Sequence, residues 1–280
     1  MLVVLSRDSI RVRSHVMLSA MRLALLVLVF VAGSAAADGL AVVDSLPEIA
    51  RVEKNRVVVI VRGELDSKAR RANTLLVEQV VADVERRFLV TKGTRHRPFT
   101  LALFAKPARY REVAGEFGPI PSDWGFYMPG ARIALANVGA SVGNLRHELV
   151  HPLIDDDFAE IPAWLSEGLG ALYGTARWNR NRFEFLVNYR LRDLKRALTA
   201  GTLPTLAELA ASTDEDVRGR NAPTYYAYGR YVLLYLERKG TLSKFYAEMR
   251  DASGDVNAQA ELLERFVDEK AFRTWAKQLR

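Results

Sequence analysis

The sequence predicts an α+β fold in which a small mixed sheet precedes a mostly helical carboxy-terminal part. Runs of β-branched and apolar residues typical of strands occur only in the first half of the chain, whereas every regular apolar pattern beyond residue 160 has helical spacing. The length of 280 residues, with 49% hydrophobic and 26% charged residues, is enough for one sizeable core and excludes a disordered chain. Such segregation of strands and helices along the chain is typical of α+β proteins.

Residues 1–37 have the pattern of a secretory signal. Leu23–Val31 is almost entirely apolar, arginines precede it, and Ala35–Ala37 is a run of small residues suited to cleavage. We therefore predict export to the periplasm or the extracellular space, with a mature chain that begins near Asp38. The alternative is a retained membrane anchor, because the segment before the apolar run is long for a signal, and only then is a membrane partner expected.

The charge and the cysteine content exclude several functions. Loss of residues 1–37 removes four arginines and Asp8, so the net charge falls from +7 by 3 to +4. This modest charge gives little support to nucleic-acid binding, and we expect no nucleic-acid partner. The chain has no cysteine, so it has no disulfide, no thiolate metal ligand and no nucleophilic thiol.

Residues 38–145 are expected to form the α/β part of the fold. Ser67–Phe88 carries apolar residues at helical spacing, and Phe117–Gly130 has the glycine, proline and aromatic content typical of turns and loops. A glycine-bearing turn, Val138–Gly143, precedes the next helix, which Ser141 or Asn144 can cap. The expected strands are Arg56–Val61, Thr100–Phe104 and Ala131–Ala136.

Residues 146–280 are expected to be helical and to carry the functional site. Apolar residues recur there at intervals of three and four positions, which is the period of an amphipathic helix. The predicted helices are Pro162–Tyr173, Arg182–Leu198, Thr205–Ala211, Thr224–Arg238, Leu242–Arg250 and Asn257–Gln278, the last with a break.

The chemistry-bearing motif is His147-Glu148-Leu149-Val150-His151, an HExxH sequence. Positions i and i+4 lie one above the other on a helix, so His147 and His151 can bind a single metal ion. Glu148 lies about 100° further round the helix, given roughly 3.6 residues per turn, where it can act as a general base without binding the metal. This division of roles is what metal-assisted hydrolysis needs.

A catalytic zinc site needs a third protein ligand, and the next predicted helix supplies a candidate. In Pro162–Gly170, with the sequence PAWLSEGLG, Glu167 is the one acidic residue among apolar and small neighbours. An unpaired carboxylate is costly in such surroundings, and a metal ion would remove that cost.

HELVH followed by PAWLSEGLG resembles the peptidase MA-like group of gluzincin metallopeptidases, over about Arg56–Gly240. The resemblance implies a zincin-like fold with the active-site helix after the sheet. It also implies a single Zn²⁺ ion with Glu167 as the third ligand beside His147 and His151, and a peptide or protein substrate. In related zincins an extended peptide binds along an edge strand, so we predict that Ala131–Ala136 lines the substrate cleft.

Two departures from the family pattern leave alternatives open. Pro152 directly follows His151, so the helix is expected to end or kink there. The interval between His151 and Glu167 is also short, which leaves an acidic group as rival ligands: Asp155, Asp156, Asp157 and Glu160. The three aspartates could instead orient a ligating histidine or form a solvated acidic loop, the second of which their pattern favours.

Two further groups of residues have a functional and a structural interpretation. A tyrosine could stabilise an oxyanion, and the candidates are Tyr225, Tyr226 and Tyr228, with Tyr173 behind them, although helical spacing also suits a core role. The arginines from Arg177 to Arg196 could form a patch for acidic substrates or an anionic surface, but a solvated helix face is favoured.

From the sequence we therefore predict an exported zinc-dependent metallopeptidase in which Glu148 is the general base. The alternative is a domain of the same fold kept for binding or structure, in which a metal ion staples two helices and little hydrolysis occurs. Glu148 favours the enzyme, because a stapling site has no need of an acid at that position.

Overall fold

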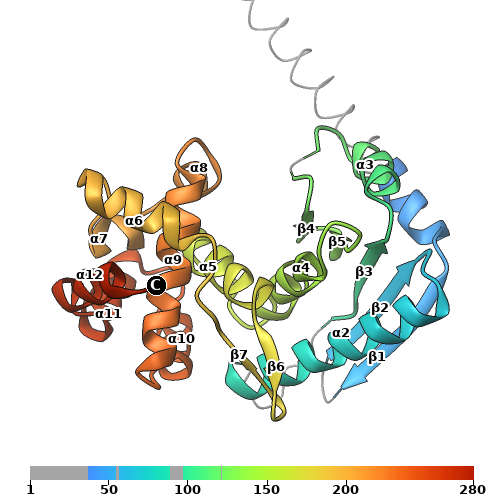
Figure 1. The fold of residues 1–280 in the computed structure, drawn as a ribbon. Coiled ribbons are helices and arrows are strands. Elements are labelled where there is room, and N and C mark those ends of the chain that lie inside the picture. The colour runs from blue at the N-terminus through green and yellow to red at the C-terminus, as the bar shows by residue number, and fades with distance from the viewer. Residues whose placement is uncertain (1–36, 55–56, 89–96, 121) are drawn as a thin grey trace, which may run out of the picture. The chain divides into compact units, whose positions relative to one another are not determined.

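The computed structural model describes residues 37–54, 57–88, 97–120 and 122–280, and Figure 1 shows their arrangement. Residues 1–36 of the predicted leader, 1–37, lie outside the described residues. Residues 37–45 form a helix. None of the helices within these described ranges is long and apolar enough to cross a membrane.

The chain divides into two compact units. The first consists of the described part of Met1–Ser45 together with Arg111–Ile120. The second consists of Leu46–Tyr110 and Pro121–Arg280. The sheet and all the helices that follow it belong to the second unit, so both of the predicted parts, 38–145 and 146–280, contribute to one compact body.

A five-stranded mixed sheet forms the β part of the second unit. Its order is β1-β2-β3-β5-β4, in which the two central pairs, β2 with β3 and β3 with β5, are parallel and the two outer pairs are antiparallel. The strands are β1 (Glu48–Lys54), β2 (Val57–Gly63), β3 (Phe99–Phe104), β4 (Gly125–Met128) and β5 (Ile133–Asn137). The predicted α+β class with a small mixed sheet is confirmed.

The three predicted strands are present, but the prediction that Ala131–Ala136 is an edge strand is wrong. That segment forms β5, which pairs with β3 on one side and β4 on the other, so its backbone groups are already used. The edge strand on this side of the sheet is β4, in a segment whose composition indicated a loop. Local composition does not reveal β4 because its four residues GFYM are too few for an alternating pattern.

Helices α2 (Ser67–Arg87) and α4 (Val142–Asp155) pack against the sheet and against one another. Asp66 caps α2, and Ser141 caps α4 by accepting a hydrogen bond from the N–H of Gly143 at 3.0 Å. The helix was expected to end or kink at Pro152, and it does not end there, because α4 continues to Asp155. Proline lacks an N–H and so leaves only the carbonyl of Glu148 without its helical donor, which packing can offset.

The predicted helices of the carboxy-terminal part are largely confirmed, with a break between α11 and α12 at Val267 and Asp268. The sequence did not reveal α3 and α8. The helices not yet named are α3 (Pro107–Gly115), α5 (Ala163–Gly174), α6 (Leu191–Ala200), α7 (Leu206–Ala210), α8 (Asp214–Arg218), α9 (Ala222–Arg238), α10 (Leu242–Asp251), α11 (Val256–Phe266) and α12 (Glu269–Gln278).

The predicted helix Arg182–Leu198 is wrong in its first half. A hairpin of β6 (Arg177–Asn179) and β7 (Arg182–Glu184) occupies this region, and α6 begins only at Leu191. Its two-residue turn has positive φ angles at Arg180 (47°) and Asn181 (65°), as a type I′ turn requires. The sequence did not indicate this turn, because glycine, the usual signal of a type I′ turn, is absent from both positions.

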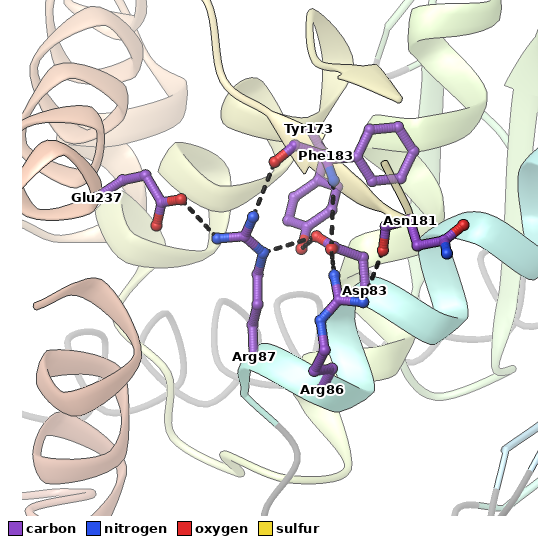
Figure 2. Close-up of polar contacts among 7 residues, drawn as sticks. All are labelled: Asp83, Arg86, Arg87, Tyr173, Asn181, Phe183 and Glu237. Carbon is purple, nitrogen blue, oxygen red and sulfur yellow. Dashed lines mark hydrogen bonds and ion pairs between the residues drawn. The ribbon is translucent and has the colours of Figure 1, made fainter. Parts of the chain in front are cut away.

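A buried carboxylate on α2 ties this hairpin and the helical part to the sheet. Asp83 is fully buried, and Figure 2 shows its surroundings. It accepts hydrogen bonds from Arg86, from Arg87 Nε at 2.8 Å, from the Tyr173 hydroxyl at 2.8 Å and from the Phe183 N–H at 3.3 Å.

The two arginines extend this network to other elements (Figure 2). Arg87 donates to Glu237 of α9 at 2.7 Å and to the carbonyl oxygen of Phe183 at 2.8 Å, while Arg86 donates to the carbonyl oxygen of Asn181 at 2.7 Å. The network therefore joins α2, the end of α5, the β6–β7 hairpin and α9. Arg86 and Arg87 lie on the same helix as Asp83, but Tyr173, Phe183 and Glu237 are distant in the sequence, so tertiary structure completes the network.

We predict that Asp83→Ala lowers the free energy of unfolding by about 3–5 kcal/mol, because it leaves the buried Tyr173 hydroxyl and Phe183 N–H without an acceptor and removes one of the two carboxylates that pair with Arg87. Urea denaturation measures this loss. The matched control is Glu78→Ala on the exposed side of the same helix, which should change stability by no more than about 0.5 kcal/mol. Equal effects of the two substitutions would contradict the assigned role of Asp83.

Candidate metal centre

Helix α4 presents the HExxH residues toward α5. The imidazole rings of His147 and His151 are 5.0 Å apart between centroids and are inclined at 71° to one another. Both side chains come from the same face of α4, one helical turn apart, as the spacing of the motif requires. His151 and Glu148 are buried, whereas the side chain of His147 is 19% exposed.

Helix α5 brings Glu167 onto both imidazoles. Its Oε2 atom lies 3.2 Å from His147 Nε2 and 3.9 Å from His151 Nε2. One ligand atom from each of these three residues falls within 4.8 Å of the others. The structure thus brings together the three residues that the sequence nominated as metal ligands.

The donor set fits a zinc ion. In a tetrahedral site with ligand bonds of roughly 2.0–2.2 Å, neighbouring ligand atoms are about 3.4 Å apart. The separations of 3.2 Å and 3.9 Å from Glu167 Oε2 to the two Nε2 atoms lie on either side of that value. Two imidazoles and a carboxylate are also the ligand types found in hydrolytic zinc sites, so His147, His151 and Glu167 could hold one ion.

Close contact between α4 and α5 makes this convergence possible (Figure 1). A Cβ atom on Gly170 would lie 2.8 Å from Cε1 of His147, so no larger residue fits there without moving the ring. Arg146 of α4 donates from Nε to the carbonyl oxygen of Tyr173 at 2.9 Å and from Nη2 to that of Gly174 at 2.8 Å, which satisfies the end of α5. The two helices are therefore locked beside the histidines.

Ser166 orients the second histidine. His151 Nδ1 lies 2.9 Å from the Ser166 hydroxyl oxygen. When Nε2 binds a metal, Nδ1 carries the proton and donates to this oxygen, which fixes the ring orientation and the tautomer. Tyr127 of β4 stacks on the same ring, with centroids 6.5 Å apart and planes at 8°. Sequence reasoning missed both residues, although Ser166 adjoins Glu167.

The charges of the site are strongly coupled. Burial opposes ionisation of His147, but the hydrogen bond that its ring donates to Glu167 and the charges of the nearby carboxylates outweigh burial and raise its pKa. Burial lowers the pKa of His151 to about 4, so this imidazole is neutral and able to act as a ligand. Burial also opposes ionisation of Glu167, but His151, His147 and Arg218 keep its pKa well below the usual range.

Glu148 lies against the edge of the sheet rather than among the three ligand atoms. A Cβ atom on Gly125, the first residue of β4, would lie 2.5 Å from Cγ of Glu148. Burial, partly offset by His147, raises the pKa of Glu148 to about 8. A carboxyl group with a pKa in this range can take up and release a proton near neutral pH.

One of the four candidate tyrosines lies at the site. The ring of Tyr226 is parallel to that of His147, with centroids 6.4 Å apart and planes at 6°, and its hydroxyl interacts with Glu167. Burial, then the charge of Glu167, raises the Tyr226 pKa well above its usual value, so the hydroxyl keeps its proton. Tyr228 packs on Phe272 in the core, and Tyr173 donates to Asp83.

Arg218 of α8 contacts the remaining oxygen of Glu167, and sequence reasoning missed it. Its Nε atom lies 3.2 Å from Glu167 Oε1, and its guanidinium also pairs with Asp214. Glu167 therefore has one oxygen toward the histidines and the other toward an arginine. The helix α8 is predictable in retrospect, because Thr213 and Asp216 form a capping box.

The rival acidic ligands lie elsewhere. Asp156 pairs with Arg132 at 2.6 Å, Asp157 pairs with Arg250 at 3.1 Å, and Asp155 accepts from the hydroxyl of Tyr127 at 3.1 Å. The interpretation of a solvated acidic loop is wrong, since the side chains of Asp156 and Asp157 are only 9% and 3% exposed. Glu160 is exposed and lies against Gly254.

Comparisons with known proteins do not assign the chain to a family. No protein-family model matches it, and no curated protein sequence matches it. The α+β fold and the cluster of His147, His151 and Glu167 are therefore the observations from which a function can be inferred.

We predict that Gly170→Ala weakens binding of Zn²⁺ by at least about tenfold, because the added methyl group displaces the His147 ring. Isothermal titration of the metal-free protein measures the affinity. The control is Gly174→Ala on the same helix, where the nearest atom to the new methyl group would be 3.5 Å away. A loss of affinity in the control equal to that in Gly170→Ala would show that helix packing in general, rather than ring displacement, is responsible.

Proposed function

We propose that this chain is an exported zinc-dependent metallopeptidase with a zincin-like fold of the gluzincin type. The observation that carries the proposal is the convergence of His147, His151 and Glu167 within 4.8 Å, with buried Glu148 next to them. The HExxH motif and the glutamate on the following helix support the same class. The proposed export depends on residues 1–37, whose sequence has the signal pattern.

Each residue of the centre has a role in peptide hydrolysis under this proposal. A zinc ion, when bound, acidifies water and polarises the scissile carbonyl group. Glu148 takes the proton from the attacking water and returns it to the leaving amine. The Tyr226 hydroxyl donates a hydrogen bond to the oxyanion as charge develops there.

Strand β4 supports a mode of substrate binding. It is an edge strand, and it begins at Gly125, which contacts Glu148. The N–H of Asn137 donates to the carbonyl oxygen of Trp124 at 2.9 Å, so the backbone groups of Trp124 face β5. In an antiparallel pair every second residue faces the partner strand, and Tyr127 is three residues further along. The backbone groups of Tyr127 therefore point away from β5. An extended peptide can pair with these groups whatever its sequence, and side-chain pockets then select among peptides.

We predict that Glu148→Gln separates metal binding from catalysis. The variant should hold zinc at the wild-type stoichiometry and lose at least about a hundredfold in kcat, because it keeps the shape of the side chain and removes the proton acceptor. Metal analysis together with digestion of a broad peptide library measures both quantities.

Ligand variants provide the comparison for that experiment. Glu167→Ala and His147→Ala should lose zinc and activity together, whereas Glu160→Ala should retain both because Glu160 lies outside the cluster. If zinc-loaded wild-type protein cleaves no peptide, or if Glu148→Gln cleaves as fast as wild type, the peptidase proposal fails. A domain in which the metal staples α4 to α5 would then replace it.

We predict that Tyr127→Pro raises KM at least about tenfold above that of Tyr127→Ala, with equal zinc content, because only proline removes the outward N–H of the edge strand. Both variants lose the ring that stacks on His151, so their difference isolates the backbone donor. The pairing of β4 with β5 should survive, since proline is tolerated where the N–H of an edge strand faces outward. Equal KM values for the two variants would mean that β4 does not bind substrate in this way.

A further inference from the structure

Arg190 lies beside the candidate metal centre in a defined position. Its guanidinium carbon is 4.8 Å from the ring centroid of Tyr226 and 5.3 Å from that of Tyr189. Tyr226 in turn stacks on His147, so Arg190 and this predicted metal ligand contact the same aromatic ring. Contacts with two aromatic rings limit the rotamers of this half-buried arginine, so its charge is held near the metal ligands.

Within the described part of the chain Arg190 has no carboxylate partner, in contrast to three other arginines of this segment. Arg177 pairs with Glu184 at 2.8 Å, and both Arg192 and Arg196 approach Asp193, at 3.8 Å and 3.6 Å. Among the residues that the structure describes, the guanidinium of Arg190 forms neither an ion pair nor a side-chain hydrogen bond. Its donors remain available for a ligand.

A second arginine adds to the positive charge of this region. Arg230 lies one helical turn after Tyr226 on α9 and is fully buried, and its Nε and Nη1 atoms have no hydrogen-bond partner within the described part of the chain. Its Nη2 atom donates to Thr175 at 2.9 Å and to the carbonyl oxygen of Leu186. Burial, together with the charge of Arg190, lowers the Arg230 pKa to about 10.

Two neighbouring cations without an acidic partner create a local excess of positive charge. Buried arginines are ordinarily paired, because an uncompensated charge in a protein interior is costly. An anion bound at Arg190 would reduce that cost for both residues. Planar guanidinium groups bind carboxylates with two parallel hydrogen bonds, which makes a carboxylate the best match.

We propose that Arg190, positioned by Tyr189 and Tyr226 and backed by buried Arg230, binds a carboxylate group of the substrate next to the scissile bond. The proposal rests on the proposed peptidase function for the identity of the substrate as a peptide. The carboxylate has two possible sources, an acidic side chain or the free carboxy terminus. The second source would make the protein a carboxypeptidase.

The experiment compares four synthetic peptide pools that are randomised over non-acidic residues. Two pools differ only in having a free or an amidated carboxy terminus, and two amidated pools differ only in having glutamate or glutamine at one central position. The zinc-loaded wild type, Arg190→Gln and the control Arg192→Gln are compared by mass spectrometry for kcat/KM on each pool. Arg192 is a suitable control because it lies two residues away and its side chain is 76% exposed.

The expected result is that the wild type prefers one carboxylate-bearing pool over its matched pool without the carboxylate by about tenfold or more in kcat/KM. The difference should come from a lower KM, as one charge-assisted hydrogen-bonded pair would produce. Arg190→Gln should reduce the ratio of kcat/KM on the preferred pool to kcat/KM on its matched pool to about one. Arg192→Gln should keep the wild-type ratio. The pool that is preferred identifies the source. Cleavage of all pools at equal rates by wild type would overturn the carboxylate proposal and leave the peptidase function standing.

A binding measurement decides the case in which zinc-loaded wild type cleaves nothing. Immobilised, zinc-loaded Glu148→Gln protein is exposed to the same pools, and the retained peptides are identified. Preferential retention of a carboxylate-bearing pool, lost in the double variant Glu148→Gln with Arg190→Gln, would support the carboxylate site even without catalysis. Equal retention of all pools would overturn it.

Discussion

The candidate centre depends on one constraint, which is that a buried carboxylate from one helix must reach two imidazoles of another. Glu167 is 5% exposed, and it would be unstable there without its partners. Glycine at position 170 allows the two helices to approach until Glu167 Oε2 is 3.2 Å from His147 Nε2. A bulkier residue would separate the carboxylate from the histidines, and the charge balance of the whole site would be lost.

Helix α5 is held near both ends, and this is why a single carboxylate can be placed so closely. Near its start, Ser166 contacts His151, and at its end Arg146 binds the last carbonyl oxygens while Tyr173 donates to Asp83. The Asp83 network then extends to the hairpin that follows α5. The candidate metal ligands are thus supported by the same polar contacts that join the sheet to the helical part.

The electrostatics of the centre follow from the surroundings of each carboxylate. Glu167 faces two imidazoles and Arg218, which favour its ionised form, whereas burial of Glu148 raises its pKa to about 8. Two carboxylates in one site are thereby suited to different tasks, one as a permanent anion and the other as a group that exchanges protons. Arg190, which lies over the ring of Tyr226, and its neighbour Arg230 add positive charge beside the centre.

The sequence by itself determined the features that depend on neighbouring residues. The spacing of His147 and His151 and most of the helices follow from local periodicity, and of the two caps that the sequence offered, Ser141 and Asn144, the structure uses Ser141. Glu167 could be nominated because an acid in an apolar helix needs a cation. Short elements such as β4 and the β6–β7 hairpin could not be predicted, because few residues carry too little pattern and their stability comes from partners distant in the chain.

Only the tertiary structure decided which distant groups meet. It placed β4 rather than β5 at the edge of the sheet, selected Tyr226 among four tyrosines, and gave Asp156 and Asp157 arginine partners in place of a metal. It also brought Arg218 onto Glu167, across 51 residues of sequence. The physical reason is that burial and charge pairing depend on distances in space, whereas a single sequence specifies only which side chains share a face of one helix or strand.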